Sequence, residues 1–545
     1  MNRTFSLLAL GCLLATAALP AITDPVKTES GSVAGASNID STVRIYKGIP
    51  YAAPPVGDLR WKAPQPAPDW GGVRMADQFG NVCTAGGGGG RGRGGPGRGA
   101  QGQGAQGPGG QARGGAPRGN PNPAVAANPG RGPAGPPPSE DCLYINVWTP
   151  AKAANAKLPV FVWTYGGGFT GGSGSDSWYD GETLAKKGII VVTYNYRLGM
   201  FGFFAHPDLT AEDPHHTSGN YGMMDWLAAL QWVQKNIAAF GGDPRKVTIG
   251  GESAGSIMVA NTVASPLAKG LFIRAIGQSG AWMGLSITKM RTLAQAEEAG
   301  KRAAGTHSIA ELRAMSTQDL GQNLRGVQAG IIVDGYILPE DQTITYTKGK
   351  QLDVDVLIGS NHDEGTFFQR GGVTAEQAQG DAKRVYGELA PDFLKLWPAS
   401  NDAEAAASVL ARSRDEVGWH MRTWAELQTK RGKKAYLYYF THVPPGNGAR
   451  GATHTAEISY MNGNPRGAAW TDEDKKLSEV MTSYWANFVA TGNPNGKGLP
   501  KWEAYHAKSN DGKAMVLGDT VEFGPQIDVP RLEFFDKFYA IEQKQ

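Results

Sequence analysis

Residues 247–255 read VTIGGESAG, the most informative stretch of this 545-residue chain. The run from Val247 to Ile249 is short, apolar and rich in β-branched residues, which predicts a buried strand. A helix candidate at 256–264 follows at once, so Ser253 lies on the turn between the two elements. Such a turn is so tight that side chains at 251 and 255 would collide, and both positions are Gly. We expect Ser253 to adopt strained backbone angles at the end of the strand.

The remaining chain repeats this alternation of strand and helix signals. Residues 43–46 predict a strand near the N-terminus. Near-continuous apolar runs predict further strands that are buried on both faces, at 160–163, 189–196, 247–249, 273–276, 356–358 and 436–440. Apolar residues at helical spacing predict a helix over 221–240, which Gly241 would end. The pattern predicts an α/β fold with a mostly parallel central sheet covered by helices. Two helix-prone stretches, 288–326 and 374–429, are expected as excursions near the mouth of a site.

The composition excludes several classes of protein. The 53 basic and 50 acidic side chains leave a formal charge of +3, too little for the global basic field of a nucleic-acid-binding protein. Hydrophobic residues make up 41% of the chain, enough for a large core. With only 3 Cys in a chain of this length, a small scaffold held together by disulfides is excluded.

The N-terminus has the layout of a secretory signal peptide over residues 1–21. Arg3 precedes an apolar stretch from Phe5 to Leu19, and small residues follow that offer cleavage sites. About 15 apolar residues fall short of the roughly 20 that span a membrane. We expect a secreted or periplasmic protein that has no membrane anchor once the signal is removed.

Removal of the signal would leave Cys83 and Cys142, which are expected to form one disulfide in an exported chain, the alternative being two free thiols. Residues 85–138, which lie between them, are almost entirely Gly, Pro, Ala, Arg, Gln and Asn, and we expect this insertion to be disordered. Its six Arg resemble an arginine-glycine tract that binds nucleic acid. The tract lacks interleaved aromatic residues for base stacking, which favours a tolerated insertion without a nucleic-acid partner.

A second Gly-rich motif, Gly166 to Gly168, follows the strand predicted at 160–163. Backbone N–H groups with no side chain in the way can stabilise the oxyanion of acyl transfer. A flexible loop and a phosphate cradle are the alternatives. The phosphate interpretation lacks the Gly-Lys-Ser/Thr that would follow, and the spacing does not give the dinucleotide fingerprint.

A serine nucleophile needs a base, and the base needs a carboxylate that orients it. In hydrolases built on this turn the acid and then the His follow the Ser along the chain. His454 lies in a Gly-rich loop after the strand predicted at 436–440 and is the first candidate, with His442 as the second. Asp363 and Glu364 both follow the strand predicted at 356–358, and the residues alone do not separate them. No His-Glu-x-x-His motif or Cys cluster is present, so neither a metal nor another cofactor is expected.

With these motifs, the sequence resembles the type-B carboxylesterases, the α/β-hydrolase family that includes cholinesterases and bacterial para-nitrobenzyl esterases. The resemblance runs from about Thr28 to Phe538, apart from the insertion, and rests chiefly on EDCLYINV at 140–147 and on FGGDP at 240–244 followed by the Ser253 turn. It implies the α/β-hydrolase fold over residues 22–545, with helical excursions around an active-site gorge.

The resemblance also implies roles for single residues. Ser253 would be the nucleophile, Glu364 rather than Asp363 the acid, and His454 the base. The further expectations are an oxyanion hole from the backbone amides of Gly167, Gly168 and Ala254, a disulfide between Cys83 and Cys142, an ion pair between Arg60 and Glu140, a polar position at Glu457, and an acyl pocket or plain core at Trp282 and Met283.

Together these features predict an exported serine esterase that hydrolyses small-molecule carboxylic esters through an acyl-enzyme intermediate. No aromatic residue lies between Cys83 and Tyr144, where cholinesterases carry the Trp that stacks on choline, so a quaternary ammonium substrate is not expected. The alternative is a catalytically inactive, cholinesterase-like binding or adhesion protein. Such relatives lack part of the triad, whereas all three residues are present here.

Overall fold

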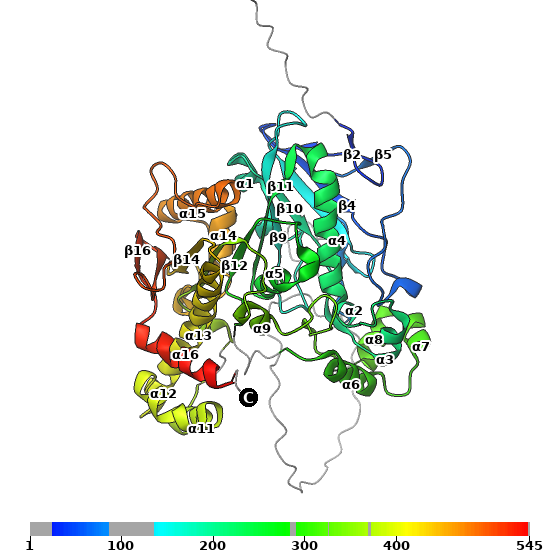
Figure 1. Ribbon diagram of the computed structural model, residues 1–545. Coiled ribbons are helices and arrows are strands. Elements are labelled where there is room, and N and C mark those ends of the chain that lie inside the picture. The colour runs from blue at the N-terminus through cyan, green and yellow to red at the C-terminus, as the bar shows by residue number, and fades with distance from the viewer. Residues whose placement is uncertain (1–23, 87–135, 284–289, 325, 369–371, 543–545) are drawn as a thin grey trace, which may run out of the picture.

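A large twisted sheet forms the centre of the computed structural model, which describes residues 24–86, 136–283, 290–324, 326–368 and 372–542 (Figure 1). In the described part of the chain this sheet has 11 strands, in the order β16-β15-β14-β13-β12-β11-β9-β10-β8-β4-β3. In chain order the strands are β3 (Ala36–Ser37), β4 (Arg44–Pro50), β8 (Tyr144–Thr149), β9 (Leu158–Thr164), β10 (Ile190–Tyr194), β11 (Gly242–Glu252), β12 (Arg274–Gln278), β13 (Asp355–Asn361), β14 (Ala435–Phe440), β15 (Lys513–Leu517) and β16 (Val521–Pro525).

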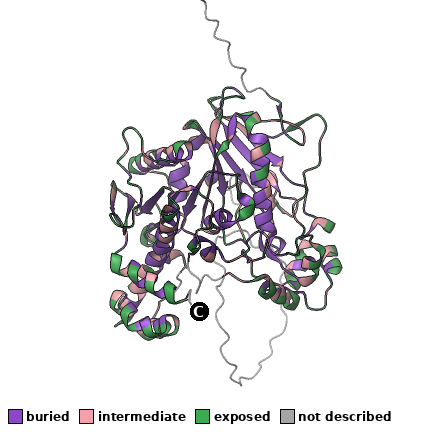
Figure 2. Ribbon diagram, in the orientation of Figure 1, coloured by how far each residue is buried: buried purple, intermediate pink, exposed green. Residues whose placement is uncertain are grey.

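The middle of the sheet is parallel, from β10 through β9, β11, β12, β13 and β14 to β15. The strands at both edges pair antiparallel. Every residue of β10 and β14 is buried, as their continuous apolar sequences predict. Figure 2 shows the strands buried and the outer helices exposed on one side. The expectation of a mostly parallel sheet covered by helices is confirmed.

Helices cover both faces of the sheet. Gly277 of β12 faces α5 (Ala254–Ala264) and α13 (Asp402–Lys430), since a Cβ built on it would meet Ser256 and Trp424. The next residue, Gln278, points the other way and accepts a hydrogen bond from Trp485 of α15 (Asp472–Thr491). Because the carboxyl ends of parallel strands meet at one edge, the loops after β11, β13 and β14 are brought together there.

The long helix predicted at 221–240 is present as α4 (Tyr221–Asn236) and a 3-10 turn (Ile237–Phe240), ended by Gly241 in the left-handed region with φ 83°. The stretch 288–326 holds α6 (Leu293–Ala304), α7 (Ile309–Ala314) and α8 (Thr317–Asn323). The stretch 374–429 holds α11 (Ala375–Tyr386) and α12 (Ala390–Leu396), and half of it belongs to α13, a 29-residue helix that packs on β13 and β14. The half of the stretch that α13 forms therefore covers the sheet rather than forming an excursion, because α13 packs on β13 and β14.

The remaining elements are short or peripheral. They are β1 (Val26–Lys27), β2 (Ser32–Ala34), β5 (Val73–Met75), β6 (Val82–Cys83), β7 (Pro138–Ser139), α1 (Glu182–Lys186), α2 (Gly199–Phe203), α3 (Pro207–Glu212), α9 (Gln342–Thr347), α10 (Gly365–Phe368), α14 (Ala456–Asn462), α16 (Val529–Glu542), and the 3-10 turns at Gly57–Leu59, Ser177–Tyr179, Pro266–Ala268, Gly387–Leu389 and Gly448–Arg450. Among the described helices, none is both long and apolar enough to cross a membrane.

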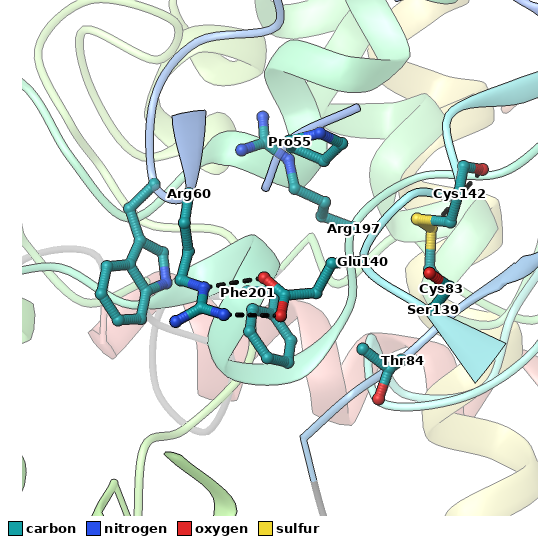
Figure 3. Close-up of a pocket in the computed structure, with 10 residues that line it drawn as sticks. Pro55, Arg60, Cys83, Thr84, Ser139, Glu140, Cys142, Arg197 and Phe201 are labelled. Atoms are coloured by element: carbon teal, nitrogen blue, oxygen red, sulfur yellow. Dashed lines mark hydrogen bonds and ion pairs between the residues drawn. A yellow bond between two sulfur atoms is a disulfide. The ribbon is translucent and has the colours of Figure 1, made fainter. Parts of the chain in front are cut away.

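Cys83 and Cys142 form a disulfide, so this expectation is confirmed (Figure 3). Strands β6 and β7 pair beside it, and Arg60 forms a two-pronged ion pair with Glu140, with both N···O distances 2.7 Å. These residues line a cavity of about 10 Å³, room for roughly one water molecule and far too little for an ester. Most of the predicted insertion at 85–138 and all of the predicted signal peptide at 1–21 lie outside the described residues.

Candidate active site

Ser253 lies at the sharp turn between β11 and α5. Its backbone angles, φ 54° and ψ −123°, are strained for a residue with a side chain, as the sequence predicts. A Cβ at Gly251 would lie 2.5 Å from the carbonyl carbon of Gly255, and a Cβ at Gly255 would lie 2.2 Å from the carbonyl oxygen of Thr164. Both glycines are therefore required, although the obstacle at 255 is the end of β9 rather than residue 251.

His454 and Glu364 meet at the carboxyl edge of the sheet. The Nδ1–H of His454 donates to Oε2 of Glu364 over 2.6 Å, and both side chains are buried. Glu364 follows β13, and its other oxygen accepts from the backbone N–H of Asn361 over 3.0 Å. His454 follows β14, one strand further along the sheet.

The two sequence alternatives lie elsewhere. The Oδ2 of Asp363 accepts from the backbone N–H of Ala452 over 2.8 Å, so Asp363 holds the loop that carries His454 rather than its ring. His442 is placed between Asp474 and Asp519, at 2.7 and 2.8 Å. Of the candidate pairs, the structure brings together Glu364 and His454.

The other nitrogen of His454 lies beside the Ser253 turn. Its Nε2 is 3.1 Å from Oε1 of Glu252, the residue that directly precedes Ser253. The imidazole therefore extends from the acid at Nδ1 to the turn at Nε2. Glu252 stands between Gly251 and Ser253, at a position to which the sequence motifs assign no role. A carboxylate directly after the uncharged run 247–251, and directly before the serine, is the signal that could have singled it out.

Glu457, three residues after His454, is a third fully buried carboxylate at this edge. It accepts hydrogen bonds from Nε2 of Gln278 over 2.9 Å and from Nδ2 of Asn361. Trp485 in turn donates to Gln278 over 3.1 Å. This network occupies the oxygens of Glu457, which fits the polar position that the family resemblance implies.

Burial and charge together set the proton affinities of the cluster. Burial raises the pKa of Glu252 well above its usual range, although the charge of His454 opposes the shift. Burial also raises the pKa of Glu457. Burial alone would lower the pKa of His454, but the charges of Glu252 and Glu364 and the hydrogen bond that His454 donates to Glu364 raise it to about 9. A proton that rests on Glu252 removes its charge, and the pKa of His454 then falls toward the range of a base that works near neutral pH.

The Gly-rich turn after β9 lies against Ser253. A Cβ at Gly166 would lie 3.0 Å from Cβ of Ser253. Gly167 and Gly168 follow with φ of 102° and 63°, in the region that favours glycine. Ala254, buried, is the first residue of α5. The three expected oxyanion-hole residues are thus placed on the two turns that meet at Ser253.

Trp282 and Met283 follow β12 on the segment that contacts the Ser253 turn. Met283 is fully buried, whereas Trp282 is partly exposed. Within the described ranges, no group of three or more His, Cys, Asp or Glu is arranged to hold a metal ion.

Residues 23–534 match the model of the Carboxylesterase family. The chain belongs to this family. Among curated relatives of this carboxylesterase, the fumonisin B1 esterase of Sphingopyxis macrogoltabida is 34% identical over 563 residues, covering 97% of this chain and 94% of the relative. The para-nitrobenzyl esterase of Bacillus subtilis (strain 168) is 32% identical over 530 residues, covering 92% and 96%.

Solved structures agree with the family. A PNB esterase superposes on this carboxylesterase with a TM-score of 0.74 at 30% identity, covering 93% of this chain and 98% of that one. The Geobacillus stearothermophilus carboxylesterase EST55 gives a TM-score of 0.73 at 29% identity, covering 93% and 99%. The predicted α/β-hydrolase fold and the prediction of a type-B carboxylesterase are both confirmed.

Proposed function

We propose that this carboxylesterase cleaves carboxylic esters with Ser253 as nucleophile, His454 as general base and Glu364 as the acid that orients the base. The main support for the proposal is the hydrogen bond between His454 and Glu364. The other nitrogen of the same imidazole lies beside the Ser253 turn. Because Glu364 holds the proton of the neutral imidazole at Nδ1, Nε2 carries no proton and can accept one from Ser253.

The chemistry proceeds in two halves. The Ser253 oxygen attacks the ester carbonyl carbon while His454 takes its proton, which gives a tetrahedral oxyanion. His454 then gives the proton to the leaving alcohol, and an acyl-enzyme remains. In the second half water attacks the acyl carbon while His454 takes a proton from it. His454 then gives this proton to the Ser253 oxygen as the acyl bond breaks, which releases the carboxylic acid and restores Ser253.

We assign the oxyanion hole to the backbone N–H groups of Gly167, Gly168 and Ala254. The positive φ of both glycines turns the backbone of this loop at the point where it meets Ser253. Donors fixed before the reaction are effective because they need no reorganisation as charge develops.

We infer export, with residues 1–21 as a signal peptide. The Cys83–Cys142 disulfide supports this, because disulfides persist in oxidising compartments. The printed names of the relatives, fumonisin B1 esterase and para-nitrobenzyl esterase, support esters of small molecules as substrates. The inactive binding protein is disfavoured, since a buried His–Glu pair beside a strained serine is costly to keep without chemistry.

Replacement of Ser253 by Ala tests the proposal. It should lower kcat for short-acyl para-nitrophenyl esters by about 10⁴-fold or more, with an unchanged circular dichroism spectrum. Ser256→Ala is the matched control: Ser256 lies one turn further along α5, is buried, and its hydroxyl has no hydrogen-bond partner in the described part of the chain. Wild-type turnover in Ser253→Ala would overturn the proposal.

A further inference from the structure

The segment 278–283, which follows β12, contacts the nucleophile turn directly. The carbonyl oxygen of Gln278 accepts from the backbone N–H of Ser253 over 2.9 Å. A Cβ at Gly280 would lie 2.4 Å from the carbonyl oxygen of Ser253, so the two backbones touch. A shift of this segment therefore changes the immediate surroundings of Ser253.

The segment is held in a conformation that it would not adopt alone. Ser279 and Trp282 both have φ of 53°, in the left-handed region, where a bulky side chain is rare. Such angles persist when surrounding contacts impose them. Ala281 and Met283 on either side are buried, whereas the indole of Trp282 is partly exposed.

Two buried side chains from separate helices impose this conformation. His420 of α13 accepts at Nδ1 from the backbone N–H of Met283 over 2.8 Å. Gln342, the first residue of α9, donates its Nε2–H groups to the carbonyl oxygens of Ala281, over 2.5 Å, and Trp282, over 3.0 Å. Hydrogen bonds from Gln342 and to His420 thus hold the backbone of residues 281–283 from two different helices.

His420 is suited to be a permanent acceptor. Burial lowers its pKa to about 3, so the ring stays neutral at any pH at which an esterase of this kind works. Its ring also packs edge to face with Trp282, with centroids 5.2 Å apart. On its other sides lie Trp419 and Tyr539, with centroids at 5.1 and 5.5 Å. The ring thus contacts the Trp282 side chain as well as the backbone beside it.

We propose that His420 and Gln342 are positioning residues that fix the turn at 281–283 and so place the Trp282 indole against the acyl group of the substrate. The two residues would thereby determine which acyl lengths the enzyme accepts. This inference rests on the proposed function, in which Ser253 carries the acyl group.

Kinetics on two ester series test the inference. One series varies the acyl group of para-nitrophenyl esters from acetate to hexanoate, and the other varies the alcohol of acetate esters. His420→Leu removes the acceptor and should raise the hexanoate-to-acetate ratio of kcat/KM by about tenfold, the scale of one or two methylenes in a pocket. Trp282→Ala should change the ratio in the same direction, and neither variant should change the preference in the alcohol series.

Two further variants separate positioning from a general loss of packing. His420→Asn puts an amide oxygen near the position of Nδ1 and should keep the wild-type ratio, because Nε2 of His420 has no partner in the described part of the chain. Gln342→Leu removes the donors on the other side of the turn without changing α13. It should raise the hexanoate-to-acetate ratio as expected for His420→Leu, and it serves as the test if His420→Leu does not fold. His307→Leu, a partly exposed site, is the control.

The outcomes separate a failure of this inference from a failure of the proposed esterase mechanism. An unchanged acyl ratio in His420→Leu and Gln342→Leu, or an unchanged ratio in Trp282→Ala, overturns the inference and leaves the proposed function standing. Wild-type turnover in Ser253→Ala overturns both.

Discussion

Oε1 of Glu252 lies 3.1 Å from Nε2 of His454, the nitrogen to which we assign proton transfer. Burial raises the pKa of Glu252 well above its usual range, so Glu252 and His454 compete for a proton. The negative charge of Glu252 favours the imidazolium form of His454, which cannot act as a base. We therefore expect the charge balance between Glu252 and His454 to determine the pH at which the enzyme becomes active.

Glu252→Gln removes this charge and keeps the shape of the side chain. The pKa of His454, raised to about 9 with the carboxylates charged, should fall. Since the neutral imidazole is the active form, the acid limb of the profile of kcat/KM against pH should move to lower pH. Glu388→Gln, at an exposed site, should leave the profile unchanged. Movement of the acid limb to higher pH would contradict the account.

Glu364 and Asp363 are neighbours with different contacts, which makes them a matched pair. Glu364→Gln loses the charge that orients and stabilises His454, and kcat should fall by about 10³–10⁴-fold. Asp363→Asn weakens one hydrogen bond to the loop that carries His454, and should cost about tenfold or less. Steady-state kinetics on both variants decide the point, and an equal loss in the two would contradict the assignment.

The sequence motifs reveal the members of this site unevenly. Ser253 and the glycines around it can be predicted, because a tight turn imposes local rules. The choice of Glu364 over Asp363 needs the family resemblance, since both residues follow the same strand. Glu252 is missed, because its role comes from His454, which is 202 positions away along the chain (454 − 252) and meets it only across the sheet edge.

At the scale of elements, the helices and strands meet at close backbone contacts. The carbonyl oxygen of Thr164, at the end of β9, occupies the space that a side chain at Gly255 would need. Helix α5 can therefore approach the sheet closely enough to hold Ser253 at the edge. The strained turn of Ser253 depends on this contact.

Gly255→Ala tests the contact. The added methyl would lie 2.2 Å from the Thr164 oxygen, so the helix must move. We expect a loss of about 1–3 kcal/mol in the free energy of unfolding, together with a large loss of kcat. Gly380→Ala, on an exposed face of α11 with nothing within 4 Å, should instead gain about 0.5–1 kcal/mol. Urea denaturation of both variants measures the difference, and equal stabilities would contradict the account.

The central strands are predictable because burial on both faces makes their sequences continuously apolar. Strands β8, β15 and β16 are not predicted: Asn146 interrupts the apolar sequence of β8, β15 begins at an exposed Lys, and most residues of β16 are partly or fully exposed. Helix α5 begins at Ala254, two residues earlier than predicted, because the turn leaves no room for a longer connection. The place of α13 over β13 and β14 depends on tertiary packing, which its helical pattern alone does not reveal.

At the scale of the whole molecule, the disulfide and the β6–β7 pair close the chain on either side of residues 87–135. These contacts join the two ends of the insertion independently of what lies between them.

Replacement of residues 86–135 by a Gly-Ser linker of about six residues, long enough to reconnect the paired strands, should leave kcat and KM for short-acyl esters within about twofold. Michaelis–Menten kinetics beside the full-length enzyme measure the effect. A large loss of kcat in a variant that keeps its thermal unfolding midpoint would show that the insertion takes part in turnover.

The central claim is that residues 253, 364 and 454 assemble one activated serine. Reaction with a fluorophosphonate, followed by peptide mass spectrometry, tests it most directly, since such reagents phosphonylate a serine hydroxyl, with loss of fluoride, only when a base activates it. The account predicts one adduct per chain, on Ser253, that forms in step with loss of esterase activity and is abolished in His454→Gln. An adduct on another residue, or full inactivation with Ser253 unmodified, would contradict it.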